Sequence, residues 1–103
     1  SQAMTDFYKM MEEVNELHST INQYRKEGRY EEATELAAEN RSTLAKRQAL
    51  TSAQKQFRAL RNDMELIRRS KELTADEKRT RINNMLARRN NLAARMIRRF
   101  EEQ

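Results

Sequence analysis

Apolar residues recur at steps of three and four along most of the chain, the spacing that places them on one face of an α-helix. The first run follows Thr5 and Asp6, either of which can cap a helix by accepting a bond from a free backbone N–H. The pattern predicts a helix over about residues 5–27. Its apolar face carries Phe7, Met10, Met11, Val14, Leu17, Ile21 and Tyr24. Gly28, the single glycine, predicts a left-handed cap and the first hinge.

A second apolar stripe predicts a long helix over about residues 30–72. The stripe comprises Tyr30, Ala33, Leu36, Ala37, Leu44, Leu50, Ala53, Phe57, Leu60, Met64 and Ile67. Its phase slips between Leu44 and Leu50, and Thr51 with Gln54 has the spacing of a capping box that would open a new helix near residues 50–52. A continuous helix is favoured over this break, because neither glycine nor proline interrupts the segment. Such a helix would span on the order of 60 Å.

The third predicted helix covers about residues 75–101 and begins at a stronger signal. Thr74 and Glu77 have the spacing of a capping box, in which each side chain accepts the other residue's backbone N–H. The inward face of this helix carries Ile82, Met85, Leu86, Leu92, Ala93, Met96 and Phe100. Arg89 falls on the same face, so its head group must reach solvent or find a carboxylate.

These elements predict an all-α fold: an elongated, antiparallel, three-helix coiled-coil-like bundle with one long central helix, in a single domain over residues 1–103. The outer helices overlap only near the middle of the central one, so both ends of the rod have two helices. Two-helix ends bury little apolar surface, and we expect a partner helix or a second copy to cover them. The predicted core seam comprises Leu17, Ile21, Phe57, Leu60, Met64, Ile67, Ile82, Leu86, Met96 and Phe100.

The composition agrees with long helices and narrows the class of protein. Of the residues, 37% are hydrophobic and 36% are charged, which suits helices that each bury one narrow stripe. The chain has no proline and no cysteine, so disulfides and thiolate metal sites are excluded. No apolar run approaches the roughly 18 residues of a membrane-spanning helix, and no secretory signal is visible, so we expect a cytoplasmic protein. Residues 1–3 resemble the remainder of a cleaved tag before Met4.

Six methionines are most simply explained by core packing, since five of them fall on the predicted inner faces. Met4 lies before the predicted first helix, and its position does not indicate whether it is buried. The five on inner faces are Met10, Met11, Met64, Met85 and Met96.

Charge is divided unevenly along the chain. Residues 1–50 hold seven Lys or Arg and nine Asp or Glu, a net of −2, whereas residues 51–103 hold fourteen and seven, a net of +7. In the third helix Arg81, Arg88 and Arg95 repeat every seven residues and form one ridge, which together with Arg98 and Arg99 gives a candidate polyanion-binding set. The competing interpretation is a solvated face that forms salt bridges with the acidic first half of the chain, at Glu12, Glu16, Glu31, Glu35 and Glu39. The ridge has no interleaved aromatic residue, which argues against base stacking.

No residue set in the sequence has the spacing of a catalytic or metal site. His18 is the only histidine, and a packing role at the edge of the first stripe is favoured over metal binding. No Glu-x-x-His motif accompanies the glutamates of residues 31–39, which disfavours a di-iron bundle site. No serine has a base at helical spacing. We therefore expect no enzymatic activity, no cofactor and no small-molecule substrate.

Residues 73–79, Leu-Thr-Ala-Asp-Glu-Lys-Arg, and the later Arg-Arg-Asn-Asn-Leu-Ala of residues 88–93 carry a family resemblance. They resemble the C-terminal helical hairpins of large multidomain proteins of phages and mobile elements, such as internal virion proteins ejected with DNA. The likeness spans about residues 55–97. It implies a structural or interaction element without catalytic residues.

The sequence therefore favours a non-enzymatic helical scaffold or assembly module. The resemblance implies that such a module is part of a phage structural or DNA-ejection protein, with a virion-associated location as the alternative to the cytoplasm. The module would act by self-association as a homo-oligomer or by docking a partner helix along its apolar stripes. The alternative is a nucleic-acid-binding module in which the arginine ridge contacts backbone phosphates.

Overall fold

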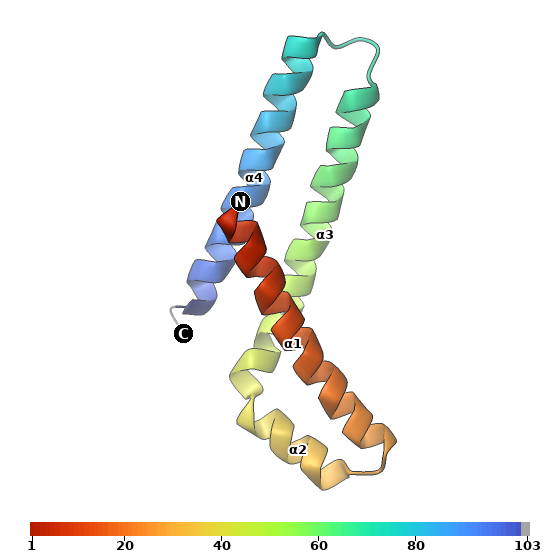
Figure 1. The fold of residues 1–103 in the computed structure, drawn as a ribbon, viewed down its shortest axis with the longest axis vertical. Coiled ribbons are helices and arrows are strands. Elements are labelled where there is room, and N and C mark those ends of the chain that lie inside the picture. Colours follow the sequence, from red (N-terminus) through yellow and green to blue (C-terminus); the bar gives the residue numbers. More distant parts are fainter. Residues whose placement is uncertain (102–103) are drawn as a thin grey trace.

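The computed structural model describes residues 1–101 as an elongated molecule measuring 60 × 30 × 16 Å (Figure 1). Within this range the chain forms four helices and no strand, which confirms the all-α prediction. The helices are α1 (Gln2–Lys26), α2 (Tyr30–Glu39), α3 (Arg41–Arg69) and α4 (Ala75–Glu101). No helix in this part of the chain is both long enough and apolar enough to cross a lipid bilayer.

The hinge after α1 has the geometry that Gly28 predicts. Gly28 adopts a φ of +76°, in the left-handed region where a side chain would be strained. Its N–H donates to the Arg25 carbonyl at 3.1 Å, and the Arg29 N–H donates to the Tyr24 carbonyl at 2.8 Å. This pair of bonds is the Schellman motif, which satisfies carbonyls that the helix end leaves free. The motif reverses the chain, so that α2 packs back on α1.

The prediction of one continuous helix over residues 30–72 is wrong. Helix α2 ends at Glu39 and α3 begins at Arg41, with Asn40 between them at φ −121° and ψ 29°. The Asn40 side chain donates to the Leu36 carbonyl at 2.9 Å, replacing a helical bond that the break removes. Asparagine competes for backbone hydrogen bonds in this way, so a helix can end without glycine or proline. Thr51 lies inside α3, so the weaker signal at residues 50–52 does not mark a break either.

The turn between α3 and α4 has the predicted capping box. The Thr74 N–H donates to Glu77 Oε1 at 3.1 Å, and the Glu77 N–H donates to Thr74 Oγ1 at 3.1 Å. The hydrogen bond from the Thr74 backbone N–H makes the largest contribution to the lowered pKa of the Glu77 carboxyl, and the Thr74 side chain makes a smaller one. Lys78 Nζ also donates to the Arg68 carbonyl at 2.9 Å and ties α4 to the end of α3.

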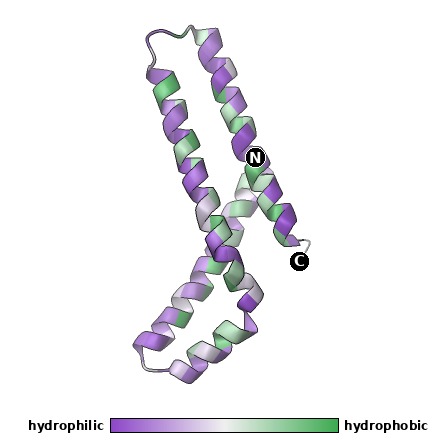
Figure 2. Ribbon diagram, turned by 180° about the vertical axis from the view of Figure 1, so that it is seen from behind, coloured by the Kyte–Doolittle hydropathy of each residue, from purple (hydrophilic) through white to green (hydrophobic). Residues whose placement is uncertain are grey.

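The hydrophobic core lies where α1 crosses the α3–α4 pair. Phe7 is fully buried there, and its ring meets the ring of Phe57 edge-on with centroids 4.8 Å apart. In Figure 2, hydrophobic and hydrophilic positions alternate along each helix, as an amphipathic pattern requires. The core cluster comprises Met4, Phe7, Met11, Val14, Leu50, Ala53, Phe57, Ala93, Met96 and Phe100.

The predicted core seam agrees with this cluster only in part. Five of its ten residues are buried: Ile21, Phe57, Met64, Met96 and Phe100. The other five are half-buried: Leu17, Leu60, Ile67, Ile82 and Leu86. The sequence assignment also left out Met4, which lies within α1 and is buried in the core.

Both ends of the molecule have two helices, α1 with α2 at one end and α3 with α4 at the other (Figure 1). Outside the core cluster, the buried apolar residues among the described ones are Ile21, Ala33 and Met64. Tyr30 and Leu66 remain 66% and 67% exposed. The structure therefore does not confirm a three-helix bundle with one long central helix. It shows a three-helix centre with two thinly packed arms.

Replacing Leu50 by Ala should lower the free energy of unfolding by about 2–5 kcal/mol, because the side chain is fully buried in the centre. The same change at Leu66, in the same helix but 67% exposed, should cost less than about 0.5 kcal/mol. Urea unfolding followed by circular dichroism measures both. Equal losses for the two variants would contradict a core confined to the three-helix centre.

Candidate binding surfaces

The interior of the described chain offers no polar group for chemistry. Every buried side chain among residues 1–101 is apolar, and no three His, Asp or Glu in that range are grouped to hold a metal ion. His18 is half-buried in α1, where its Nδ1 accepts a bond from Asn22 Nδ2 at 3.4 Å. Candidate function must therefore be sought on the surface.

The helices divide the charge between the two ends of the molecule. Helix α2 carries four glutamates and no Lys or Arg. Helix α3 carries eight Lys or Arg and two acidic residues, and α4 carries eight and three, so their net charges are +6 and +5. The α3–α4 arm is thus strongly basic, and the α2 end is acidic.

The acidic residues of α2 do not neutralise the basic helices. Helix α2 packs on α1, touches α3, and makes no contact with α4. The ion pairs recorded for residues 1–101 all join residues two to four positions apart, and none involves Glu31, Glu35 or Glu39. No recorded salt bridge joins the predicted glutamates to the arginine ridge within the described chain, so that part of the competing interpretation is wrong. The exposure of Arg81, Arg88 and Arg95 agrees with its other part, a solvated helix face.

Three of the five predicted polyanion-binding arginines line one shallow groove on α4. Arg88, Arg95 and Arg98 surround Asn91 and Ala94 in this groove of about 530 Å³, here called the outer groove. Arg81 is exposed but lies outside it, nearer the hairpin turn. The Arg99 guanidinium carbon lies 5.7 Å from the Phe100 ring centroid, where it covers the end of the core. The structure therefore brings three of the five predicted arginines together in one groove and leaves Arg81 and Arg99 outside it.

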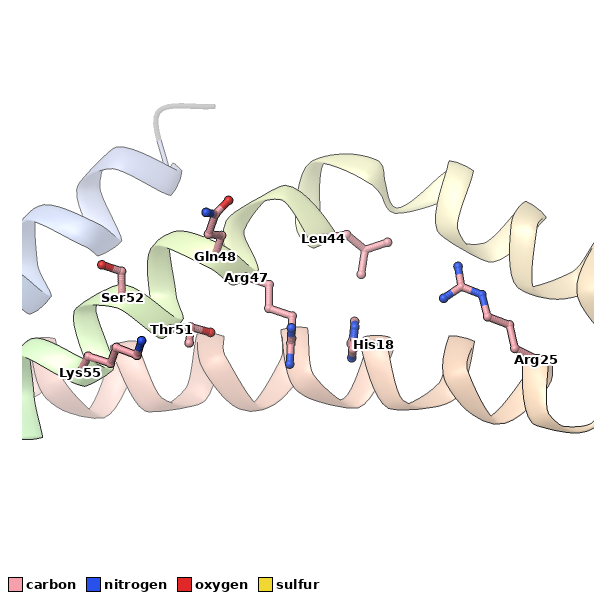
Figure 3. A pocket seen from close by; sticks show the side chains of 8 residues that line it. All are labelled: His18, Arg25, Leu44, Arg47, Gln48, Thr51, Ser52 and Lys55. Atoms are coloured by element: carbon pink, nitrogen blue, oxygen red, sulfur yellow. The ribbon is translucent and has the colours of Figure 1, made fainter.

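A larger groove of about 650 Å³ lies between α1 and α3, here called the hinge groove. Figure 3 shows Arg47 extending from α3 toward the α1 segment that carries His18, while Arg25 points into the same space. Arg25 Nη1 donates to Asn22 Oδ1 at 3.3 Å, which helps to hold it there. The lining comprises His18, Arg25, Leu44, Arg47, Gln48, Thr51, Ser52 and Lys55.

A third groove, of about 420 Å³, lies on the α3–α4 arm at the N-terminal end of α1, here called the arm groove. Arg58, Arg61 and Arg89 line it beside apolar side chains. Arg89 is half-buried, and its Nε and Nη2 both donate to the neutral Asn90 Oδ1, at 3.1 and 3.0 Å. The carboxylate that its position on the inner face calls for is not supplied by any described residue. The full lining is Met4, Tyr8, Gln54, Phe57, Arg58, Arg61, Met64 and Arg89.

Sequence reasoning missed the cations of α3. Arg47, Lys55, Arg58 and Arg61 line the two grooves that flank α1, yet the predicted polyanion-binding set was drawn only from the third predicted helix. The predicted helix over residues 30–72 joins the acidic α2 to the basic α3, nine Lys or Arg with seven Asp or Glu, and its small net charge concealed the basic segment. The position of these cations beside α1 depends on how the helices pack and cannot be predicted from residue spacing along the chain.

No protein-family model matches the chain, and neither a curated protein nor a solved structure matches it. Functional residues therefore cannot be carried over from a matched relative. The resemblance of residues 55–97 to phage-type hairpins stays a prediction.

Replacing Arg89 by Met should raise the free energy of unfolding by on the order of 1 kcal/mol, because the change removes a half-buried charge without a carboxylate and adds apolar contact. Arg95→Met, at an exposed position of the same helix, should leave stability within about 0.5 kcal/mol. Thermal unfolding monitored by circular dichroism makes the comparison. Destabilisation by Arg89→Met alone would show that Arg89 stabilises the fold.

Proposed function

We propose that this protein is a non-enzymatic nucleic-acid-binding module whose basic grooves hold the phosphate backbone. One observation carries the proposal: these three grooves are lined by nine Lys or Arg side chains and by no carboxylate of the described chain, although Arg88 and Arg95 also line a neighbouring groove together with Asp63. Cations that are gathered on a surface and left without internal partners are the electrostatic signature of backbone binding. The nine are Arg25, Arg47, Lys55, Arg58, Arg61, Arg88, Arg89, Arg95 and Arg98.

The same surfaces favour binding without base recognition. Tyr8 is the only aromatic residue besides the buried Phe57 that lines these grooves, so stacking platforms for successive bases are lacking. Arg88 and Arg95 lie seven residues apart on one side of α4, which is about 10 Å along the helix axis. They can contact separate phosphates while leaving base edges unread, so we expect affinity that depends on salt and little on sequence.

The triple variant Arg88→Ala/Arg95→Ala/Arg98→Ala should weaken binding to a short DNA duplex and lower the slope of log K against log salt by about 3, one unit for each lost phosphate contact. Fluorescence anisotropy at ionic strengths between about 20 and 200 mM measures this slope.

The matched control replaces Lys26, Lys71 and Arg79 by Ala. All three are exposed and line none of the grooves, so the slope should fall by less than one unit. Absence of duplex binding by the unmodified protein at the lowest salt concentration would overturn the proposal.

A second candidate function is helical assembly by self-association or by docking of a partner helix. The two thinly packed arms support it, since Met64 is the one buried residue of the distal α3–α4 arm outside the core cluster. Half-buried Leu60, Ile67 and Leu86 would gain burial from a third helix. A structural module within a large phage-type protein is the setting that the sequence resemblance implies.

Static light scattering over a range of protein concentrations tests this second function. Self-association should give a mean mass above that of one chain, rising with concentration. A single-chain mass up to about 1 mM would overturn self-association, since contacts this weak have no significance for assembly.

A further inference from the structure

We propose that the arm groove binds the outer face of helix α2 from a second copy of this chain. This inference rests on the assembly function proposed above and names its surface and its partner. The arm groove lies where α1 begins: Met4 and Tyr8, on the first turns of α1, form one end of its lining. In Figure 1 the α3–α4 pair continues beyond the N-terminus without a third helix. A helix docked there would cover the part of the α3–α4 pair that α1 leaves uncovered.

The chemistry of the arm groove differs from that of the other two basic grooves. Buried side chains of Met4, Phe57 and Met64 form part of its lining, and Arg58, Arg61 and Arg89 supply three positive charges. In contrast, Leu44 is the only large apolar residue in the hinge groove, and the outer groove has none. An apolar surface with cationic neighbours is complementary to an amphipathic acidic helix more than to a bare phosphate backbone.

The outer face of α2 has the complementary chemistry. Tyr30, Thr34 and Ala38 recur every four residues and line a shallow surface of about 410 Å³ together with Glu31 and Glu35. All five are exposed, and Tyr30 keeps 66% of its surface in solvent. The face therefore offers a large aromatic side chain that has no cover and is flanked by carboxylates.

The carboxylates of α2 fall into two groups. Glu32 forms an ion pair with Arg29, which also binds Glu27 just before α2. The bond to Glu32 is the largest cause, and that to Glu27 the second, of the raised pKa of Arg29. The bond between Arg29 and Glu32 also lowers the pKa of Glu32. Glu31, Glu35 and Glu39 have no cation of the described chain within ion-pair distance. Three carboxylates on one end and three arginines in the arm groove thus lack ion-pair partners within the described molecule.

The two surfaces cannot meet within one molecule. Arg58 follows the Asn40 break by eighteen residues of helix, which is about 27 Å along α3. Helix α2 also folds back on α1 and makes no contact with α4. The partner must be another copy, and because the two surfaces differ, the contact is head-to-tail. Such contacts propagate into open chains unless rotation closes a ring. The facing surfaces are small, so we expect weak, reversible association.

Two charge reversals on exposed residues test the pairing. The first variant, Glu31→Lys/Glu35→Lys, makes the α2 face basic, and the second, Arg58→Glu/Arg61→Glu, makes the arm groove acidic. Each should weaken self-association at least tenfold, measured by sedimentation equilibrium at about 50 mM salt, because like charges then oppose each other.

An equimolar mixture of the two variants should recover association to within about threefold of the unmodified protein, because the basic α2 face of one then meets the acidic groove of the other. The controls Glu12→Lys/Glu16→Lys and Lys71→Glu/Arg79→Glu change charge equally, at exposed positions that line neither surface, and should leave association within twofold. Circular dichroism verifies that every variant keeps its helices.

The outcomes separate this inference from the function on which it rests. If the unmodified protein self-associates but both reversed variants associate equally well, or if their mixture stays monomeric, the pairing is overturned and assembly through another surface remains. If the unmodified protein is monomeric throughout, both are overturned. If Arg58→Glu/Arg61→Glu weakens DNA binding yet leaves self-association intact, the arm groove serves the phosphate backbone alone and the pairing is again overturned.

Discussion

The edge-on contact between Phe7 of α1 and Phe57 of α3 anchors the arrangement of the whole molecule. It holds the N-terminal half of α1 across the α3–α4 pair, and the core cluster gathers around it from these three helices alone. The three largest fully buried side chains of the described residues, Phe7, Val14 and Leu50, all belong to this cluster. Stability is therefore concentrated in the centre, and the arms depend on it for their orientation.

The same packing creates the surfaces that suggest function. Helix α1 is shorter than the α3–α4 hairpin and diverges from it toward α2 (Figure 1). The hinge groove lies between α1 and α3 on the side toward α2. The arm groove lies at the other end of α1, next to its first turns. Arg89 shows the consequence most clearly, because it lies on the inner face of α4 at the point where α1 no longer covers that face. Both flanking grooves are thus boundaries of the core, and their cations are positioned by it.

Charge and shape combine into a molecule with two chemically different ends. The α2 end concentrates carboxylates, and the α3–α4 arm concentrates arginines, while the Gly28 and Asn40 turns fix α2 against α1 and away from α4. Attraction between unlike charges is then available only to other molecules, whether a nucleic-acid backbone or a second copy of the chain. Phosphate binding and head-to-tail association draw on the same basic arm, and the apolar lining of the arm groove distinguishes them.

The sequence by itself determined the elements with local causes. The helical stripes follow from residue spacing, the reversal at Gly28 from the need for a left-handed residue, and the start of α4 from the reciprocal bonds of Thr74 and Glu77. The break at Asn40 escaped prediction because only glycine and proline were considered as helix breaks, whereas the Asn40 side chain ends α2 by a local bond to the Leu36 carbonyl. Tertiary structure decided which apolar residues are buried and which cations share a groove. Both depend on where α1 packs against α3 and α4, and the spacing of residues along the chain does not determine this packing.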